Sequence, residues 1–137
     1  MSDRYPVRWA GRRAIVMLPQ HVGEFNASRI RELLLLVISR GATELVADMT
    51  GTAWCDQAGA AAIVHAQLRA AASGTQLRLV VTAEAVRRAL AHSGLDRLVP
   101  VYPSLEAATT IEGLVIPMTL KRGGLPVPEP RERTELS

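Results

Sequence analysis

Cys55 and His65 are the first residues to consider, because a thiol beside an imidazole is a common nucleophile and base. They lie ten residues apart, with Cys55 in a loop and His65 inside the helix predicted to follow it. Because a helix rises about 1.5 Å per residue, His65 stands too far along its helix to bond to that thiol. We therefore expect no nucleophilic site, and a single cysteine excludes a disulfide framework.

The other residues that could bind a cofactor are dispersed. His21, His65 and His92 fall in separate predicted elements, which does not match the ligand spacing of a metal site. Gly51 and Gly59 do not form a Walker or Rossmann phosphate-binding loop. The sequence therefore predicts no metal, no cofactor and no enzymatic activity.

The composition excludes several further classes of protein. The chain has 137 residues, 48% of them hydrophobic, and a formal net charge of +3. Its arginines are scattered and only five aromatic residues are present, which disfavours a nucleic-acid groove lined with stacking rings. The longest apolar run, Leu33–Ile38, is far shorter than the roughly 20 residues that span a bilayer. The segment Met1–Val7 lacks the apolar core of a signal peptide, so we expect a cytoplasmic protein.

Strand and helix patterns alternate along the chain. Compact apolar runs predict strands at Ala14–Leu18, Glu44–Met49, Gln76–Val81 and Leu98–Val101, and Tyr5, Val7 and Trp9 predict an edge strand that turns at Gly11. Capping residues predict helices from Asn26 to Arg40, from Asp56 to Ser73, from Thr82 to His92 and from Ser104 to about Glu112. This alternation predicts an α/β fold, a mainly parallel sheet of four to five strands with about four packed helices.

The amino-acid composition of the chain changes near residue 113. Residues 1–112 read as one domain, whereas residues 113–137 are rich in Pro, Gly and charge and read as a tail. The first part of that tail, Leu114–Leu120, is apolar enough to dock on a surface, and the alternative is an extension that does not pack.

Three segments resemble the STAS domain of anti-sigma factor antagonists. The first runs from Leu45 through Asp48 and Asp56 to Gly59, and it resembles a strand ending in Asp followed by a turn and a helix that opens with Asp-Ser. The others are Val86–Asp96 and Tyr102–Ala108, and together the three place the resemblance over about residues 7–112. The resemblance implies a STAS-type fold, in a family that includes transporters, sensors and stressosome-type scaffolds.

The resemblance also identifies a departure from the family pattern. In typical members the serine after the motif aspartate is phosphorylated by a partner kinase that is also the anti-sigma factor. The matching residue here is Gln57, followed by Ala58, and neither can be phosphorylated. A phosphoserine would add about −1.5 to −2 charge beside Asp56, whereas glutamine is neutral and can still form hydrogen bonds. The sequence therefore predicts docking without a phosphorylation switch.

The family uses the loop before the first helix and the start of the motif helix as its partner surface. In the loop, Gly23 falls where relatives often have an aspartate, and Glu24 is a possible substitute for it. The predicted partner-binding residues are Glu24, Asn26, Ser28, Asp56, Gln57, Ala58, Gly59 and Ala62. The implied partner is an anti-sigma factor or a serine kinase of the ATPase type, and binding to it would regulate transcription. A homodimer is also possible. The alternative is a non-phosphorylated STAS subunit of a larger complex, such as a stressosome-like scaffold or a lipid-transport ATPase, or a small-ligand sensor.

The helix after Asp56 has two candidate faces. Ala61, Val64, Leu68 and Ala71 recur at helical spacing, so we expect them in the core. A second stripe contains Ala58, Ala62, His65 and Arg69, and its small side chains would suit either a close partner or solvent.

Overall fold

The computed structural model describes residues 5–114, and residues 1–4 and 115–137 lie outside that description. Within this range a five-stranded sheet has the order β1-β2-β4-β6-β7. Its strands are β1 (Val7–Ala10), β2 (Arg13–Met17), β4 (Glu44–Met49), β6 (Gln76–Val81) and β7 (Val101–Tyr102). Strand β1 is antiparallel to β2, and the other neighbouring pairs are parallel. The predicted mixed α/β class, with its mainly parallel sheet, is confirmed.

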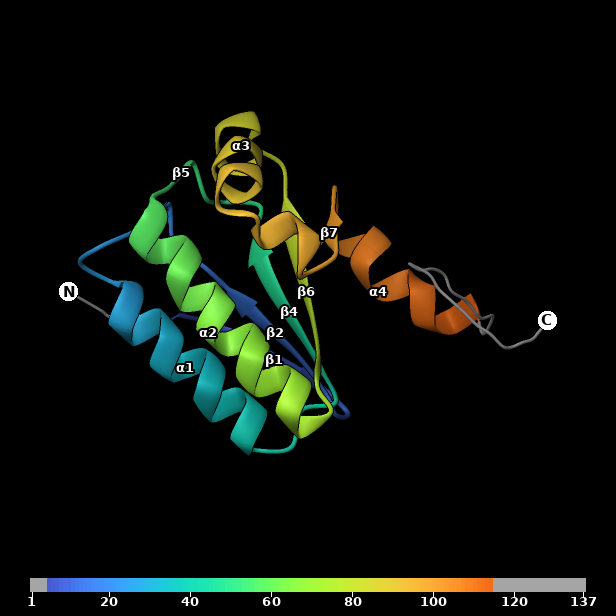
Figure 1. Cartoon of the computed structure of the whole chain (residues 1–137). Coiled ribbons are helices and arrows are strands. Elements are labelled where there is room, and N and C mark those ends of the chain that lie inside the picture. Colours follow the sequence, from blue (N-terminus) through green and yellow to red (C-terminus); the bar gives the residue numbers. More distant parts are fainter. Residues whose placement is uncertain (1–4, 115–137) are drawn as a thin grey trace.

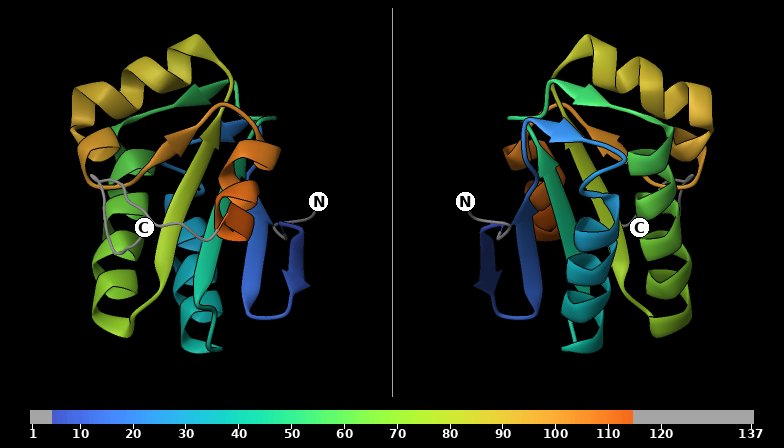
Figure 2. Two further views of the ribbon diagram at one scale, coloured as in Figure 1. Left: turned by 90° about the vertical axis from the view of Figure 1, so that its right-hand side faces the viewer. Right: turned by 90° about the vertical axis from the view of Figure 1, so that its left-hand side faces the viewer.

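The helices of the described residues are α1 (Ala27–Ser39), α2 (Gln57–Ser73), α3 (Glu84–Ser93), the short 3-10 helix η1 (Leu95–Arg97) and α4 (Leu105–Leu114). Helices α1 and α2 lie side by side against one face of the sheet, and α4 lies against the opposite face (Figures 1 and 2). Parallel neighbours require crossover connections, and helices provide them here. The carboxyl ends of β2, β4 and β6 therefore meet at one edge of the sheet, near the start of α2.

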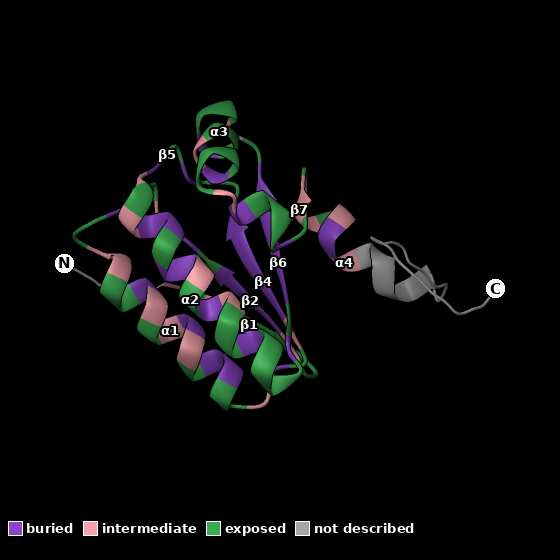
Figure 3. Cartoon of the chain, viewed as in Figure 1, coloured by how far each residue is buried: buried purple, intermediate pink, exposed green. Residues whose placement is uncertain are grey.

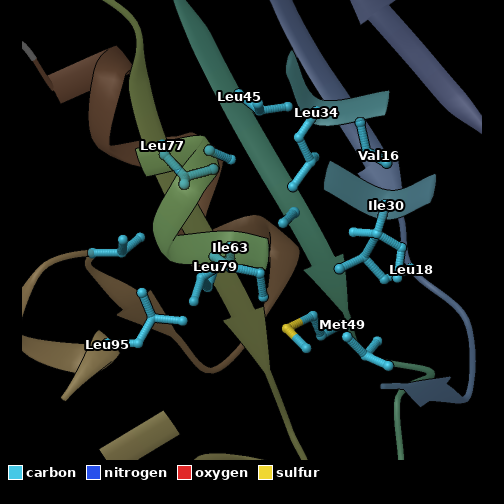
Figure 4. Packing of buried hydrophobic residues seen from close by; sticks show 14 of the residues in the cluster. Val16, Leu18, Ile30, Leu34, Leu45, Met49, Ile63, Leu77, Leu79 and Leu95 are labelled. Carbon is cyan, nitrogen blue, oxygen red and sulfur yellow. The ribbon is translucent and has the colours of Figure 1, made fainter. Parts of the chain in front are cut away.

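Strand β4 is buried on both faces of the sheet. Leu45, Ala47 and Met49 join the larger apolar cluster, which includes residues of α1 and α2 (Figure 4). Val46 points the other way and joins a smaller cluster with Ala108 of α4. Successive side chains of a strand alternate between faces, so a strand covered on both sides has a nearly continuous apolar run. That run is why the bounds of β4 were predictable.

The segment after α3 differs from the prediction. The predicted strand Leu98–Val101 shares only Val101 with the strand found here, because η1 is followed by β7 at Val101–Tyr102. The N–H of Leu98 donates to the carbonyl of Leu95 (2.9 Å), which closes a helical turn rather than a strand pairing. This turn buries Leu95 and leaves Leu98 exposed, a pattern that short apolar runs do not distinguish from a strand.

The predicted buried face of α2 was wrong. Figure 3 shows that this helix has both buried and exposed stretches. Leu68 is 63% exposed, Ala61 and Ala71 are also exposed, and Val64 is half-buried. The buried residues are Gly59, Ala60, Ala62, Ile63, Ala66 and Ala70. Alanine fits either face of a helix, so the sequence of α2 contains little periodic signal.

Two predicted caps have different outcomes. Ser104 caps α4, because its hydroxyl accepts a hydrogen bond from the N–H of Ala107 (3.0 Å). Thr82 does not cap α3, whose N-cap position is Ala83; its hydroxyl donates instead to the carbonyl of Thr50 (3.2 Å). Helix α4 runs to Leu114, and the rest of the predicted tail lies outside the described residues.

Candidate functional site

Two loops meet at the start of α2, and we call residues 19–27 together with residues 50–57 the α2 end. A short parallel sheet, β3 (His21–Val22) with β5 (Trp54–Cys55), joins the loops. Two bonds flank it: the N–H of Ala53 donates to the carbonyl of Gln20 (2.8 Å), and that of Asp56 to the carbonyl of Val22 (3.0 Å). The sequence analysis missed this sheet, whose two-residue strands carry no alternating pattern.

Asp56 uses both oxygens of its carboxylate. Oδ1 accepts from the N–H of Gly59 (2.9 Å), which confirms the predicted cap of α2. Oδ2 accepts from the N–H of Glu24 (3.1 Å) in the loop before α1. The Asp56 side chain thus caps the start of α2 and also holds the loop before α1 against it.

Asn26 occupies the predicted N-cap position of α1 but does not form the predicted cap bond. Its Oδ1 accepts from the N–H of Gly23 (2.8 Å), and its Nδ2 donates to the carbonyl of His21 (2.7 Å). Both bonds fold the loop back on itself, so Asn26 orders the loop rather than the helix terminus.

Two glycines allow the loops to approach closely. A Cβ at Gly23 would stand 2.8 Å from Oδ2 of Asp56, so an aspartate at this position would clash with that carboxylate and repel it. A Cβ at Gly59 would stand 2.6 Å from the carbonyl oxygen of Val22. Gly23, which stands where the resemblance implies an aspartate, therefore leaves room for the Asp56 carboxylate to accept from the N–H of Glu24.

The structure places Glu24, Asn26, Asp56 and Gln57 in the α2 end, and Ser28, Ala58 and Gly59 follow directly on it in α1 and α2. Gln57 is the first residue of α2 and is exposed, and Ala58 beside it is half-buried. Glu24 is exposed in the loop, and Ser28 is exposed as the second residue of α1. These four side chains remain accessible to a partner.

Two predicted partner-binding residues face inward. Ala62 is 6% exposed and lies among the buried residues of α2, so its assignment to an accessible stripe was wrong. Gly59 is also buried, against Val22 of β3. Both residues therefore pack against the rest of the fold, on the same buried side of α2 as Ile63.

Two aromatic side chains at the α2 end did not enter the sequence-based site. Phe25 is 81% exposed, and Trp54 is 47% exposed. The ring of Trp54 lies edge-on to that of His21, with the ring centroids 5.7 Å apart. The only available signal was their position beside Asn26 and Asp56, because large apolar residues are ordinarily expected inside.

Cys55 is unsuited to nucleophilic chemistry. Its side chain is buried, and its thiol donates to the carbonyl of Asp56 (3.6 Å). Burial, with a smaller contribution from the Asp56 carboxylate, raises the pKa of the Cys55 thiol to about 11. The reactive thiolate is therefore scarce at neutral pH. In the described part of the chain, no three His, Cys, Asp or Glu side chains cluster as metal ligands would.

Between residues 5 and 114, no helix combines the length and the apolar character that crossing a membrane requires.

Comparisons with solved structures find the same fold in several proteins. An anti-sigma factor antagonist from Mycobacterium paratuberculosis has a TM-score of 0.72 and 19% identity, over 79% of this chain and 92% of that one. The anti-sigma factor antagonist SpoIIAA, in its unphosphorylated form, has a TM-score of 0.68 and 18% identity, over 82% and 100%. The murine anion transporter Slc26a9 has a TM-score of 0.63 and 21% identity, over 78% of this chain and 18% of that one. At these identities the likeness concerns the fold alone.

A comparison with curated protein sequences finds no match. The model of the STAS domain family, in contrast, matches residues 9–108, which span the sheet from β1 to β7 and the start of α4. This chain therefore belongs to the STAS domain family.

Proposed function

We propose that this chain is a non-catalytic interaction module of the cytoplasm that acts like an anti-sigma factor antagonist. It would bind an anti-sigma factor or a serine kinase of the ATPase type through the α2 end, and so regulate transcription. The observation that supports this proposal is the exposed Gln57 at the first position of α2, beside the fully bonded carboxylate of Asp56.

The chemistry of position 57 supports binding that ATP does not release. The start of a helix carries roughly half a positive charge, so a serine there tolerates phosphorylation, which adds about −1.5 to −2 charge. A glutamine amide has no hydroxyl to esterify and stays neutral. Its N–H and carbonyl can still form hydrogen bonds to a docked protein. We therefore infer a constitutive binder.

The absence of catalysis is part of the proposal. The thiol of Cys55 is buried and has a raised pKa, and His65 is exposed on α2, two helical turns beyond the cap. At the α2 end the Asp56 carboxylate accepts from two backbone N–H groups, and we infer that its role there is structural.

The test measures binding to each purified ATPase-type anti-sigma factor of the source organism, with and without ATP. We expect the wild-type chain to bind one of them equally well in both conditions and to gain no phosphate by mass spectrometry. Gln57→Ser restores a hydroxyl at the start of α2, so we expect it to become phosphorylated and released. Gln57→Ala is the matched control that shortens the side chain without adding a hydroxyl.

Two results would contradict the proposal. The first is the failure of every such ATPase to bind the wild-type chain. The second is stoichiometric phosphate within residues 50–59 of the wild-type chain, together with loss of binding when ATP is added.

A further inference from the structure

Phe25 and Trp54 are large apolar side chains that the proposed function does not yet use. They belong to the two loops of the α2 end: Phe25 follows Glu24 in the chain, Trp54 precedes Asp56 by two residues, and the N–H of Glu24 is bonded to Asp56. Among the large apolar side chains of the described residues, Phe25 has the highest exposure, 81%, and the 47% exposure of Trp54 is close to that of Trp9 and Met17 in the sheet. Exposed aromatic residues that gather at one end of a fold are typical of binding anchors.

The fold holds both residues in place. Trp54 belongs to β5, its ring lies edge-on to that of His21, and its Cζ3 would be 3.2 Å from a Cβ at Gly23. Phe25 lies between Glu24, whose N–H is bonded to Asp56, and Asn26, which is bonded to Gly23 and His21. Because the backbone on both sides of Phe25 is already ordered, docking loses less conformational entropy there.

The charge of the α2 end is opposite to that of the whole chain. Residues 19–27 and 50–57 contain Glu24 and Asp56 and no Lys or Arg, although the chain has 16 Lys and Arg against 13 Asp and Glu. Glu24 is exposed, and Asp56 is half-buried. A complementary surface is therefore basic around its apolar centre.

We propose, on the basis of the proposed function, that Phe25 and Trp54 are the anchors of the interface. The partner is then a folded protein that presents an apolar pocket bordered by Arg or Lys. Phe25 and Trp54 fill the pocket, and Glu24 faces the basic border.

The test uses the full chain and the ATPase-type anti-sigma factor that binds it best. We expect Phe25→Ala and Trp54→Ala each to weaken binding about tenfold or more, as truncated anchors do. We expect the affinity to fall as salt rises, and Glu24→Gln to reduce that dependence. Trp9→Ala and Met17→Ala remove side chains from β1 and β2 whose exposure, 44% and 50%, is similar to that of Trp54, and should change binding less than about twofold.

The outcomes separate this inference from the proposed function. Binding by the wild-type chain that survives both aromatic substitutions overturns the anchors and leaves the proposed function intact. Binding that is insensitive to salt overturns the basic partner surface. Failure of every such ATPase to bind overturns both proposals. Phe25→Ala keeps the test decisive if Trp54→Ala does not fold, because the Phe25 ring is mostly in solvent.

Discussion

Because Gly59 has no side chain, the start of α2 can approach Val22 of β3 closely. A Cβ there would stand 2.6 Å from the carbonyl oxygen and 2.7 Å from Cγ1 of Val22. We expect Gly59→Ala to lower the free energy of unfolding by about 2 kcal/mol, because the clash with backbone outweighs the better helix propensity of alanine. Urea unfolding measures this difference.

Gly51→Ala is the matched control, because nothing lies within 4 Å of a Cβ at that position. Its effect on the free energy of unfolding should stay within about 0.5 kcal/mol. Equal effects of the two substitutions would refute the close contact between α2 and β3.

Cys55 makes stability depend on pH at the alkaline end. Burial raises the pKa of the folded thiol from its ordinary value of 9.0 to about 11, so folding favours the protonated form. Its contribution is complete below pH 9.0 and is lost as pH rises toward 11, since only the unfolded chain releases the proton there. Relative to Cys55→Ala, we expect the wild-type chain to lose of the order of 1 kcal/mol between about pH 8 and pH 10.

The measurement is urea unfolding of both proteins at several pH values. Cys55→Ala lowers the free energy of unfolding at every pH because packing is lost. The informative quantity is therefore how the difference in free energy of unfolding between the two proteins changes with pH. A difference that stays constant from neutral to alkaline pH would show that the thiol ionises as it does in the unfolded chain.

At the scale of elements, the two hydroxyl residues before α3 and α4 differ in their roles. Ser104 accepts from the N–H of Ala107, whereas Thr82 only donates to the carbonyl of Thr50 at an exposed position. We expect Ser104→Ala to cost about 1 kcal/mol, as the loss of an N-cap does, and Thr82→Ala less than about 0.5 kcal/mol. Thermal unfolding of the two variants compares them directly, and a larger effect at Thr82 would contradict these assignments.

At the scale of the whole molecule, charged residues between the sheet and α4 connect distant parts of the chain. Glu44 of β4 accepts from Nε of Arg13 in β2 (2.9 Å) and lies 3.9 Å from Nη2 of Arg78 in β6. The same arginines donate to α4, Arg13 to the carbonyl of Thr109 (3.5 Å) and Arg78 to that of Ala108 (3.4 Å). Glu44 therefore orients Arg13 and places a negative charge near Arg78, whose Nη2 also donates to Oε1 of Gln76 (2.7 Å).

Glu44→Gln keeps the size of the side chain and removes its charge. We expect a loss of about 1–2 kcal/mol in the free energy of unfolding, because the substitution removes a negative charge that is bonded to Arg13 and lies 3.9 Å from the nearly buried Arg78. Glu84→Gln breaks the exposed Glu84–Arg88 pair of α3 in the same way and should cost about 0.5 kcal/mol or less. Urea unfolding compares the two, and equal effects would argue against a special role for Glu44.

The sequence by itself determined the elements whose signals are local. The apolar runs of β4 and β6 predicted their bounds, and Asp56 marked the start of α2, whose predicted end at Ser73 agrees with the structure. Ser104 was recognisable as a cap in the same way. Each of these features depends on residues within a few positions of one another, and the resemblance to STAS domains was read from the same segments.

Only the tertiary structure decided how those elements combine at the α2 end. Asp56 bonds to Glu24 across 32 residues of sequence, and the pairing of β3 with β5 and the inward side of α2 have the same long-range origin. Asn26 could equally have capped α1, and Ala62 could have faced a partner, because neither side chain has a strong preference of its own. Such choices depend on which residues distant in sequence become neighbours in space, and no local pattern records that.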